Sequence, residues 1–477
     1  MHTGTPVPLC IDLDGTLIRS DTLVESLLLA LKEAPWLAFA MPLWLAGGRA
    51  GFKARMAQQV RVDPDTLPYR HELVDWARLQ ANERPVVLVT AAHRSIAEGV
   101  AAHLGFFNEV IATDGQTNLK GSRKADALLQ RFGAGAFDYA GNARPDLAVW
   151  KNARTAIVVG AGPALTQAAR SVARVEHEFD PAPTALQRAK AWIRALRLYQ
   201  WVKNLLIFLA PAASHTIFEP AVLMACLIAF LSFGLAASGV YLLNDLLDLA
   251  SDRRHPRKRR RPFASGALPL WAGMAVAPVL LLASFVIAVT VNATFTAVLA
   301  AYVVITIAYS LWAKTKTFLD VATLASLYSV RVAAGAAAAG IGLSFWLLAV
   351  CVYGFLGLAL LKRYSELVGA EGGPRDRVAG RGYARQDIPV VLALGVGSSL
   401  VATLVTALYI DSQAGHKLYA NPQLLWALVG LMLLGVGRLW LVAGRGEMHD
   451  DPIVYIARDR WSLGLLALAT GVTVMAL

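Results

Sequence analysis

The first residues whose type and spacing suggest chemistry are two aspartates near the start of the chain. Asp12 and Asp14 follow the apolar run Leu-Cys-Ile and precede Gly15. Because side chains alternate along a strand, positions two apart at its end point the same way. One carboxylate can act as a nucleophile while the other moves protons, and Gly15 lets the backbone turn sharply. The pattern predicts a catalytic pair at a strand end.

Four further oxygen-bearing residues follow a long apolar run. Asn244, Asp248 and Asp252 are spaced four residues apart, and Asp245 precedes Asp252 by seven. A continuing helix would place all four along one face. Neighbouring carboxylates repel one another unless a cation lies among them, and Mg²⁺ suits them because it takes oxygen ligands together with substrate phosphates. The alternative is a group of surface acids offset by arginines, although acids at a membrane boundary are functional by default.

The basic residues after this motif also have two explanations. Positions 253–261 hold seven Lys or Arg, which could bind phosphates. They could equally set only the topology, because loops on the cytosolic side of a membrane are rich in Lys and Arg. The predicted inner loops hold 19 such residues and the outer loops hold one, Lys417. This asymmetry predicts a multi-pass protein of a bacterial-type cytoplasmic membrane, with the N-terminal domain and the acids on the cytosolic side.

Composition divides the 477 residues into a soluble and a membrane part. Residues 1–190 look like a soluble protein, whereas residues 200–477 are mostly apolar segments joined by short loops, and the mean hydropathy of the whole chain is +0.50. We expect a soluble α/β domain followed by an all-α polytopic membrane domain of about nine transmembrane helices, with eight as the alternative count. The predicted spans are roughly 202–218, 220–243, 268–290, 292–312, 318–340, 343–361, 388–410, 422–443 and 461–477.

Charge and cysteine content restrict the partners. The net charge of +12 is concentrated in loops beside membrane segments, which favours a bilayer and phosphate-bearing partners over nucleic acid. The three cysteines have no ligand spacing, so neither a disulfide framework nor a zinc site is expected. The oligomeric state stays open, a homo-oligomer included.

Residues 5–175 resemble the haloacid dehalogenase (HAD) superfamily, which consists mostly of phosphatases. The sequence DLDGT matches its first motif, and three later stretches, RPVVLVTAAH, GSRKADALLQRF and FDYAGNARPDLAVW, match the others; the matching residues are Asp12, Asp14, Thr90, Lys124 and Asp146. The resemblance implies a Rossmann-like fold in which Asp12, the Asp14 carbonyl and Asp146 bind Mg²⁺ and Asp12 attacks phosphorus. Asn142 stands where many members have an acid, so a degenerate domain that only regulates or scaffolds is the alternative.

The sequence NDLLDLASD at the end of the second span resembles the first aspartate-rich motif of the UbiA superfamily of intramembrane prenyltransferases. The resemblance to the superfamily covers roughly residues 195–477. The finer resemblance is to one branch, decaprenyl-phosphate phosphoribosyltransferase, in LYQWVKNLLIFLAP and LKRYSEL among other stretches. That branch uses phosphoribosyl diphosphate as donor and a polyprenyl phosphate as acceptor. The second acidic cluster of quinone-type members, DxxxD, is absent, and Tyr309, Lys314 and Asp320 occupy the equivalent positions.

The resemblance assigns roles to individual residues. Asp245 and Asp248 would be catalytic, and Asn244, Asp245, Asp248 and Asp252 would hold Mg²⁺ on the diphosphate. Basic and polar residues would bind the donor and the acceptor: Lys203, Asn204, Arg253, Arg260, Tyr309, Lys314, Asp320, Arg331, Lys362, Arg363 and Tyr383. Asp450, Asp451 and Asp459 in the last inner loop are secondary candidates for a second Mg²⁺ or a ribose contact, with a topology loop as the alternative.

The expected organisation is a HAD-like phosphatase domain at 1–175 with a small helical cap at about 20–80, a linker and interfacial helix at 176–197, and a UbiA-like transferase domain at 198–477. The apolar stretch 23–48 is either a cap that contacts the bilayer or a buried cap hairpin. Together the halves predict phosphoribosyl transfer to a lipid phosphate followed by removal of the ribose 5-phosphate. The alternatives are a prenyltransferase with a prenyl diphosphate donor, a small acceptor and a regulatory HAD domain, and a transporter. The prenyl chain length stays open.

Overall fold

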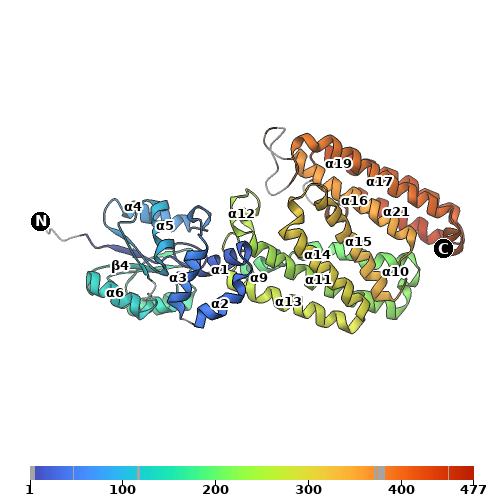
Figure 1. The fold of residues 1–477 in the computed structure, drawn as a ribbon. Helices are drawn as coiled ribbons and strands as arrows, with labels where there is room; N and C mark the ends of the chain where they lie inside the picture. Colours follow the sequence, from blue (N-terminus) through green and yellow to red (C-terminus); the bar gives the residue numbers. More distant parts are fainter. Residues whose placement is uncertain (1–5, 47, 115–118, 370–372, 374–381, 449–450) are drawn as a thin grey trace. The chain divides into compact units, whose positions relative to one another are not determined.

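The computed structural model describes residues 6–46, 48–114, 119–369, 373, 382–448 and 451–477 (Figure 1). The chain forms two compact units. The first contains Met1–Leu196 together with Tyr241–Val276, and the second contains Arg197–Val240 together with Ala277–Leu477. The loop that follows the NDLLDLASD motif therefore folds with the N-terminal domain, although it lies between two apolar helices in the sequence.

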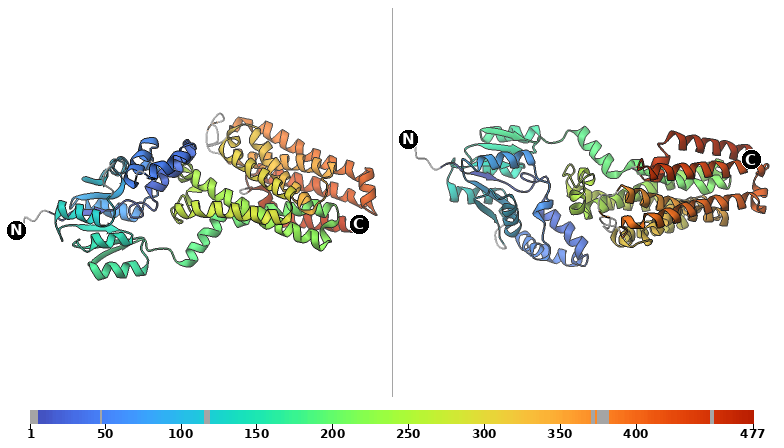
Figure 2. Two further views of the ribbon diagram at one scale, coloured as in Figure 1. Left: turned by 60° about the horizontal axis from the view of Figure 1, so that its bottom comes forward. Right: turned by 90° about the horizontal axis from the view of Figure 1, so that it is seen from above.

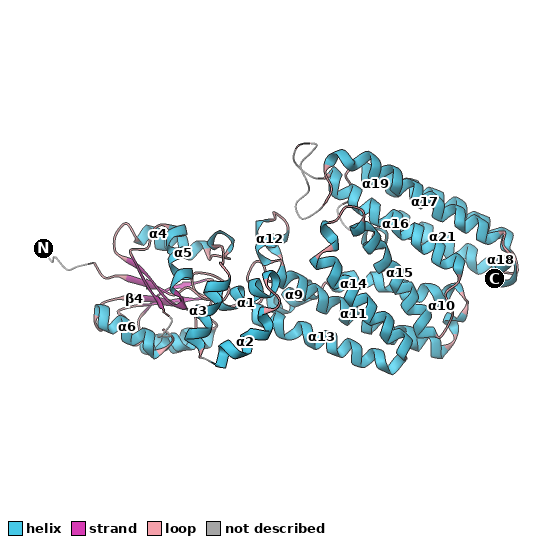
Figure 3. Ribbon diagram, in the orientation of Figure 1, coloured by secondary structure: helices cyan, strands magenta, loops and turns pink. Residues whose placement is uncertain are grey.

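A parallel sheet of six strands forms the centre of the first unit (Figure 3). Its central strand β1 pairs with β2 and β4, so that Cys10 lies beside Val87 and Tyr139. Both faces of the sheet are covered, and such strands are continuous apolar runs. The N-terminal α/β prediction is confirmed. In spatial order the strands are β3 (Glu109–Thr113), β2 (Val86–His93), β1 (Leu9–Ile11), β4 (Asp138–Gly141), β5 (Ala156–Val159) and β6 (Val175–Phe179).

Helices cover both faces of this sheet, as the two views of Figure 2 show. The segment predicted as a cap follows β1 and comprises α1 (Thr22–Glu33), α2 (Leu37–Ala46) and α3 (Arg49–Gln59). Asp21 caps α1 by accepting hydrogen bonds from the backbone of Leu23 and Val24. The remaining helices are η1 (Pro64–Thr66), α4 (His71–Gln80), α5 (Arg94–Leu104), α6 (Ser122–Phe132), η2 (Arg144–Asp146), α7 (Leu147–Trp150), α8 (Pro163–Val172) and α9 (Ala185–Leu196).

Among the described residues, seven helices are long and apolar enough to cross a membrane, and the chain is an integral membrane protein. The predicted count of nine is not confirmed. Residues 202–218 form the short helices η3 (Leu198–Phe208), α10 (Leu209–Ala213) and η4 (Thr216–Phe218), and α21 (Arg460–Ala476) has 17 residues. The seven are α11 (Pro220–Leu247), α13 (Leu270–Val291), α14 (Ala293–Leu311), α15 (Leu319–Ala339), α16 (Phe345–Val368), α17 (Ile388–Ile410) with the preceding turn, and α19 (Trp426–Gly444) with the preceding turn.

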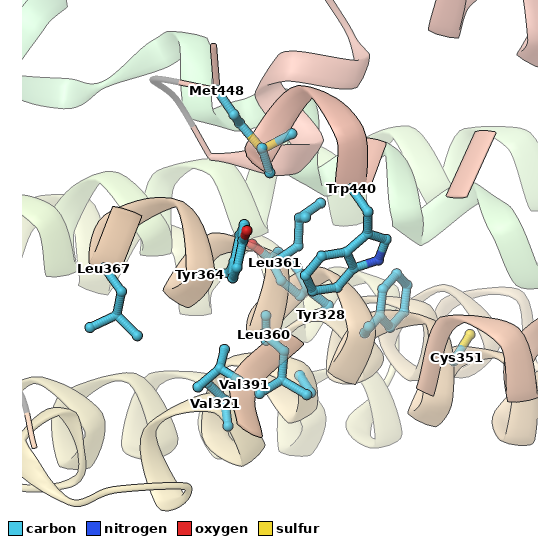
Figure 4. Packing of buried hydrophobic residues seen from close by; sticks show 14 of the residues in the cluster. Val321, Tyr328, Cys351, Leu360, Leu361, Tyr364, Leu367, Val391, Trp440 and Met448 are labelled. Atoms are coloured by element: carbon cyan, nitrogen blue, oxygen red, sulfur yellow. The ribbon is translucent and has the colours of Figure 1, made fainter. Parts of the chain in front are cut away.

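Helices α15, α16, α17 and α19 enclose the core of the second unit (Figure 4). Tyr328, Leu361 and Trp440 are among its buried side chains. The small residues of α15 serve close packing here, because a side chain on Gly335 would collide with the backbone carbonyl of Ile207.

Candidate active sites

A cavity of about 500 Å³ lies where β1 and β4 end. Asp12 follows the last residue of β1, so the parallel sheet directs it to the edge where ligands of such sheets bind. The lining of the cavity includes Asp14, Lys124, Asn142 and Asp146, which come from three separate segments of the chain. The structure thus brings together the predicted catalytic aspartates, the lysine and the fourth-motif acid.

Lys124 connects the two acids of this cavity. Its ammonium group donates to Asp12 Oδ1 at 2.7 Å and to the Tyr139 hydroxyl at 2.9 Å, and it lies 4.0 Å from Asp146 Oδ1. The Tyr139 hydroxyl in turn donates to Asp146 Oδ1 at 3.0 Å. All four side chains are buried, so each charged group has a partner that offsets its lost hydration. A buried lysine in this position can neutralise a phosphoryl group transferred to Asp12.

Burial also changes the acidity of the aspartate pair. It raises the pKa of Asp12 to about 6, although Lys124 acts in the opposite direction. Burial together with the charge of Asp21 raises the pKa of Asp14 to about 7. Asp14 Oδ1 accepts a hydrogen bond from the Thr22 backbone at 2.8 Å, which fixes its orientation. A carboxyl group with a raised pKa can donate a proton near neutral pH, which is the property a general acid needs.

Asn142 has a structural contact with the first motif. The Thr16 hydroxyl donates to Asn142 Oδ1 at 3.2 Å. Gly15 adopts a positive φ of 74°, and a Cβ at this position would collide with the Asn142 amide. The amide therefore bridges to the turn after Asp12, at the position where many HAD members carry an acid.

Thr90 was predicted to lie in this site and does not line the cavity, whereas Lys53 was not predicted and does line it. Thr90 is fully buried, and its hydroxyl accepts a hydrogen bond from the Ala92 backbone at 3.0 Å, so it lies behind the cavity wall. Lys53 of α3 does line the cavity and donates to the Ala91 carbonyl at 2.6 Å. Sequence reasoning missed Lys53, because a single lysine in a helix of mixed composition carries no local signal.

The aspartate-rich motif forms a second site within the first unit. The expectation of one continuous helix is wrong, because α11 ends at Leu247 and Asp248 starts the short helix α12 (Leu249–Arg254). Asp245 and Asp252 nevertheless face the same group: Arg261 Nη1 lies 3.1 Å from Asp245 Oδ1 and 2.7 Å from Asp252 Oδ2. Both carboxylates are buried, so a cation is required between them, and here a guanidinium supplies the charge.

The arginines that follow this motif differ in what they contact. Arg261 is the arginine that meets the acids, although sequence analysis singled out Arg253 and Arg260. The Arg253 guanidinium donates hydrogen bonds to both carboxylate oxygens of Glu25 and to the backbone carbonyls of Thr66 and Ala264. This bonding assigns Arg253 a structural role, whereas Arg260 is exposed and Asn244 is half-buried.

The second unit contains a group of opposite charges that we call the lysine–aspartate cluster: Lys203, Lys362, Tyr328 and Asp451. Lys203 Nζ lies 2.7 Å and Lys362 Nζ 3.0 Å from Asp451 Oδ2, and the Tyr328 hydroxyl lies 3.1 Å from the same oxygen. Burial alone would raise the pKa of Asp451, but the two lysines hold this pKa well below its usual range. Two ammonium groups share one carboxylate, so the cluster carries a net positive charge that suits an anion.

Arg331 and Asn204 form a polar contact in the same unit. Arg331 Nε donates to Asn204 Oδ1 at 3.2 Å, and Arg331 Nη2 donates to the Tyr302 hydroxyl at 3.1 Å. Asn204 is 1% exposed, and its Nδ2 has no hydrogen-bond partner in the described part of the chain. A buried amide donor without an acceptor is costly, which favours a ligand oxygen at this point.

Asp320, Arg363 and Tyr383 form a separate buried network. Arg363 pairs with Asp320 and with Glu366, and the Tyr383 hydroxyl donates to Asp320 Oδ1 at 3.0 Å. Asp320 and Arg363 have side-chain exposures of 1%, so this ion pair is fully buried. Tyr309 on α14 and Lys314 in η6 (Ala313–Thr315) are half-buried. Asp459 caps α21 and pairs with Arg438, whereas Asp450 lies outside the described residues.

Two places in the structure offer carboxylates that could bind Mg²⁺. No group of three or more acids, histidines or cysteines within the described ranges could hold a metal ion by protein side chains alone. Asp12 and Asp146 both lie within 4.0 Å of Lys124 Nζ, so two carboxylates border the cavity with the Asp14 backbone close by. Asp245 and Asp252 border the Arg261 guanidinium. Mg²⁺ usually binds through one or two carboxylates plus substrate phosphates, and both places offer that number.

Comparison with known proteins gives two family matches. The profile of the UbiA prenyltransferase family matches residues 205–463, and that of haloacid dehalogenase-like hydrolases matches residues 9–148. The chain is 34% identical over 99% of its length to the uncharacterized protein y4nM of Sinorhizobium fredii, of which it covers 91%. It is also 33% identical, over 60% of its length and 93% of the relative, to decaprenyl-phosphate phosphoribosyltransferase of Mycobacterium tuberculosis. A UbiA homolog from Archaeoglobus fulgidus bound to GPP and Mg²⁺ matches 59% of the chain and 99% of that structure, with 16% identity and a TM-score of 0.47.

Proposed function

Because the chain belongs to the UbiA prenyltransferase family and carries a HAD-like hydrolase domain, we propose that it is a membrane enzyme with two successive activities. The first transfers 5-phosphoribose from phosphoribosyl diphosphate to a polyprenyl phosphate, and the second removes the 5-phosphate from the lipid product. The choice of donor and acceptor rests on the sequence similarity to decaprenyl-phosphate phosphoribosyltransferase, which extends along 93% of that relative. The buried Asp12–Lys124 pair in a polar cavity supports the hydrolase step.

In the transfer step, an oxygen of the lipid phosphate attacks C1 of the ribose while the bond from C1 to the diphosphate oxygen breaks. Asp245, Asp248 and Asp252, with Asn244, are the residues that would hold Mg²⁺, which supplies positive charge to the leaving diphosphate. Arg261, paired with Asp245 and Asp252 in the free protein, lies where it can exchange these carboxylates for a diphosphate oxygen. Lys203 and Lys362 would bind the acceptor phosphate.

In the second step, Asp12 attacks the phosphorus of the 5-phosphate and forms an aspartyl-phosphate. The bond from phosphorus to the ribose oxygen breaks, and Asp14 gives that oxygen a proton. Water then attacks phosphorus, and the bond from phosphorus to the Asp12 oxygen breaks. Inorganic phosphate leaves, the Asp12 carboxylate is restored, and Asp14 takes a proton from the attacking water. Lys124 neutralises the phosphoryl oxygens throughout, while Asp12, the Asp14 carbonyl and Asp146 are the groups that would hold Mg²⁺.

Lipid mass spectrometry on the purified full-length protein tests both steps. With phosphoribosyl diphosphate, Mg²⁺ and a polyprenyl phosphate, we expect a polyprenyl-phosphate pentose and free inorganic phosphate. A parallel reaction with a labelled prenyl diphosphate and a small aromatic acceptor should leave the label unconsumed. Consumption of the prenyl diphosphate alone would refute the phosphoribosyl assignment and favour an ordinary prenyltransferase. Solute flux without any turnover would instead identify a transporter.

The cytosolic placement of both activities forms part of this proposal. The asymmetry of 19 Lys and Arg in the predicted inner loops against one in the outer loops supports it. Cysteine accessibility in spheroplasts offers a direct test. A thiol introduced at the exposed position Leu79 should react only after the membrane is permeabilised.

A further inference from the structure

Helix α2 (Leu37–Ala46) carries an apolar surface that remains uncovered within the described part of the chain. Trp36, which precedes the helix, is 67% exposed, Phe39 is 87% exposed and Leu43 is 74% exposed. They are three and four residues apart and therefore lie on one face. The sequence LAFAMPLWLA has no charged residue, whereas a helix at the surface of a soluble domain places polar residues on this face.

The opposite face of α2 is firmly packed. Leu37 is buried in a cluster with Ala30 of α1 and with Phe52 and Met56 of α3, and Met41 and Trp44 pack against the same cluster. The outer face is therefore exposed while its helix is held in a defined position. This arrangement excludes the buried cap hairpin that the sequence left open.

The neighbouring helix α1 is fastened to the polypeptide at the ends of two membrane helices. Residues 241–276 belong to the first unit and include the end of α11 and the start of α13. Glu25 of α1 pairs with Arg253 at 2.6 Å, and Lys32 of α1 lies 3.3 Å from Asp248. Gly266 packs so closely on the Arg19 backbone that a Cβ would not fit between them. These contacts hold the start of the cap where the two apolar helices leave the membrane.

Chain length then limits how far α2 can lie from the bilayer. Asp248 directly follows Leu247, the last residue of α11, which has the length and hydropathy of a membrane span. Lys32, which contacts Asp248, is four residues before Trp36, and four residues extend at most about 15 Å. The headgroup region of the membrane is therefore within reach of the exposed face.

We propose that the outer face of α2 inserts into the bilayer surface and anchors the N-terminal domain there. The occupant of this face is lipid. Ten helical residues extend about 15 Å, half of the roughly 30 Å hydrocarbon core, so α2 lies in the plane of the membrane and does not cross it. Trp36 stands just before the helix on the exposed face, and tryptophan is enriched at membrane interfaces. On α4, by contrast, Leu79 is a single exposed apolar residue, which is ordinary for a soluble surface.

Site-directed fluorescence in lipid nanodiscs tests this anchor on the full-length protein. The native thiols of Cys10, Cys226 and Cys351 are buried, so a thiol-reactive nitrobenzoxadiazole dye reports on an introduced cysteine. Phe39→Cys and Leu43→Cys place the dye on the proposed surface. Leu79→Cys is the matched control, an equally apolar and 66% exposed residue of the same domain. Nanodiscs with and without nitroxide-labelled phospholipid give the quenching ratio.

We expect blue-shifted emission and at least threefold greater lipid quenching at positions 39 and 43 than at position 79. Equal quenching at all three positions would overturn the proposal. A blue shift without lipid quenching, accompanied by disulfide-linked dimers of Phe39→Cys, would overturn it in favour of a second copy of the chain. The result does not depend on which donor or acceptor the enzyme uses, so it stands or falls separately from the proposed function.

Discussion

Glu25 and Arg253 are separated by 228 positions and form a two-point ion pair, with Glu25 Oε1 2.6 Å from Arg253 Nη2 and Oε2 3.1 Å from Nη1. Their side chains are 7% and 8% exposed. Glu25 lies eleven positions after Asp14, and Arg253 directly follows the last acid of the aspartate-rich motif. One salt bridge therefore joins the segment after the hydrolase motif to the segment after the transferase motif.

Replacing Glu25 with alanine should destabilise the protein, because it leaves the Arg253 guanidinium buried without its carboxylate. Loss of one partner of a buried pair costs about 3–5 kcal/mol. Thermal unfolding of the detergent-solubilised protein measures this loss. The double variant Glu25→Ala/Arg253→Met removes both charges and should recover part of the stability. If the double variant is less stable than Glu25→Ala alone, the ion pair is not the source of the effect.

The Asp12→Asn variant should lose phosphatase activity and accumulate a lipid-linked ribose 5-phosphate. Asparagine keeps the shape of the nucleophile but cannot form the aspartyl-phosphate, so we expect a rate loss of roughly 10⁴-fold or more. Phosphate release and lipid mass spectrometry give the two readouts. Unchanged phosphate release would remove the hydrolase assignment from this cavity.

Asp14→Asn should slow the same step by about 10²–10⁴-fold, because it removes the group that donates the proton. Its KM for a soluble phosphate monoester should stay near that of the unaltered protein, since the phosphate contacts remain. Steady-state kinetics separates these two quantities. A raised KM with an unchanged kcat would assign Asp14 to substrate binding instead.

The Asp248→Ala variant should make neither lipid product. Loss of an electrostatic group at a developing negative charge costs about 10²–10³-fold, measured as consumption of labelled phosphoribosyl diphosphate. Asp63→Ala is the matched control, because Asp63 contacts the same loop through Arg254 at 2.5 Å but lies outside the motif. Hydrolysis of a soluble phosphate monoester should remain normal in both variants. Equal turnover by the two variants would contradict a role for the motif in catalysis.

In the lysine–aspartate cluster, removing a lysine should raise the KM for the polyprenyl phosphate, and removing the Asp451 charge should lower it. Lys203→Met or Lys362→Met removes a charged donor worth about 1.5–3 kcal/mol, which corresponds to a KM roughly 10–100-fold higher. Asp451→Asn removes the carboxylate that competes with the incoming phosphate, so the KM should fall.

Lys417→Met serves as the control for this cluster, because Lys417 is an exposed lysine of the same unit on α18 (Gln413–Leu418). Its KM for the polyprenyl phosphate should equal that of the unaltered protein. If the Lys203 and Lys362 variants behave like this control, the acceptor phosphate binds elsewhere.

Local patterns predicted the features that depend on neighbouring residues in the chain. The apolar run before Asp12 predicted a strand that ends at the catalytic pair, and the lengths of seven apolar segments predicted membrane helices. A strand end or a hydrophobic length is a short-range property, so it can be read directly from the order of residues. Two further segments fell short of spanning length: residues 202–218 break into short helices, and α21 has only 17 residues.

Only the tertiary structure decided which charges meet. Arg253 and Arg261 are equivalent in a run of arginines, yet one binds Glu25 and the other binds Asp245 and Asp252. Asp451 was a candidate metal ligand by type, and the fold instead places it between Lys203 and Lys362. Such pairings depend on the packing of segments far apart in sequence, which sets burial and distance. Residue order determined the kinds of charge that the chain carries, and packing determined the partner of each.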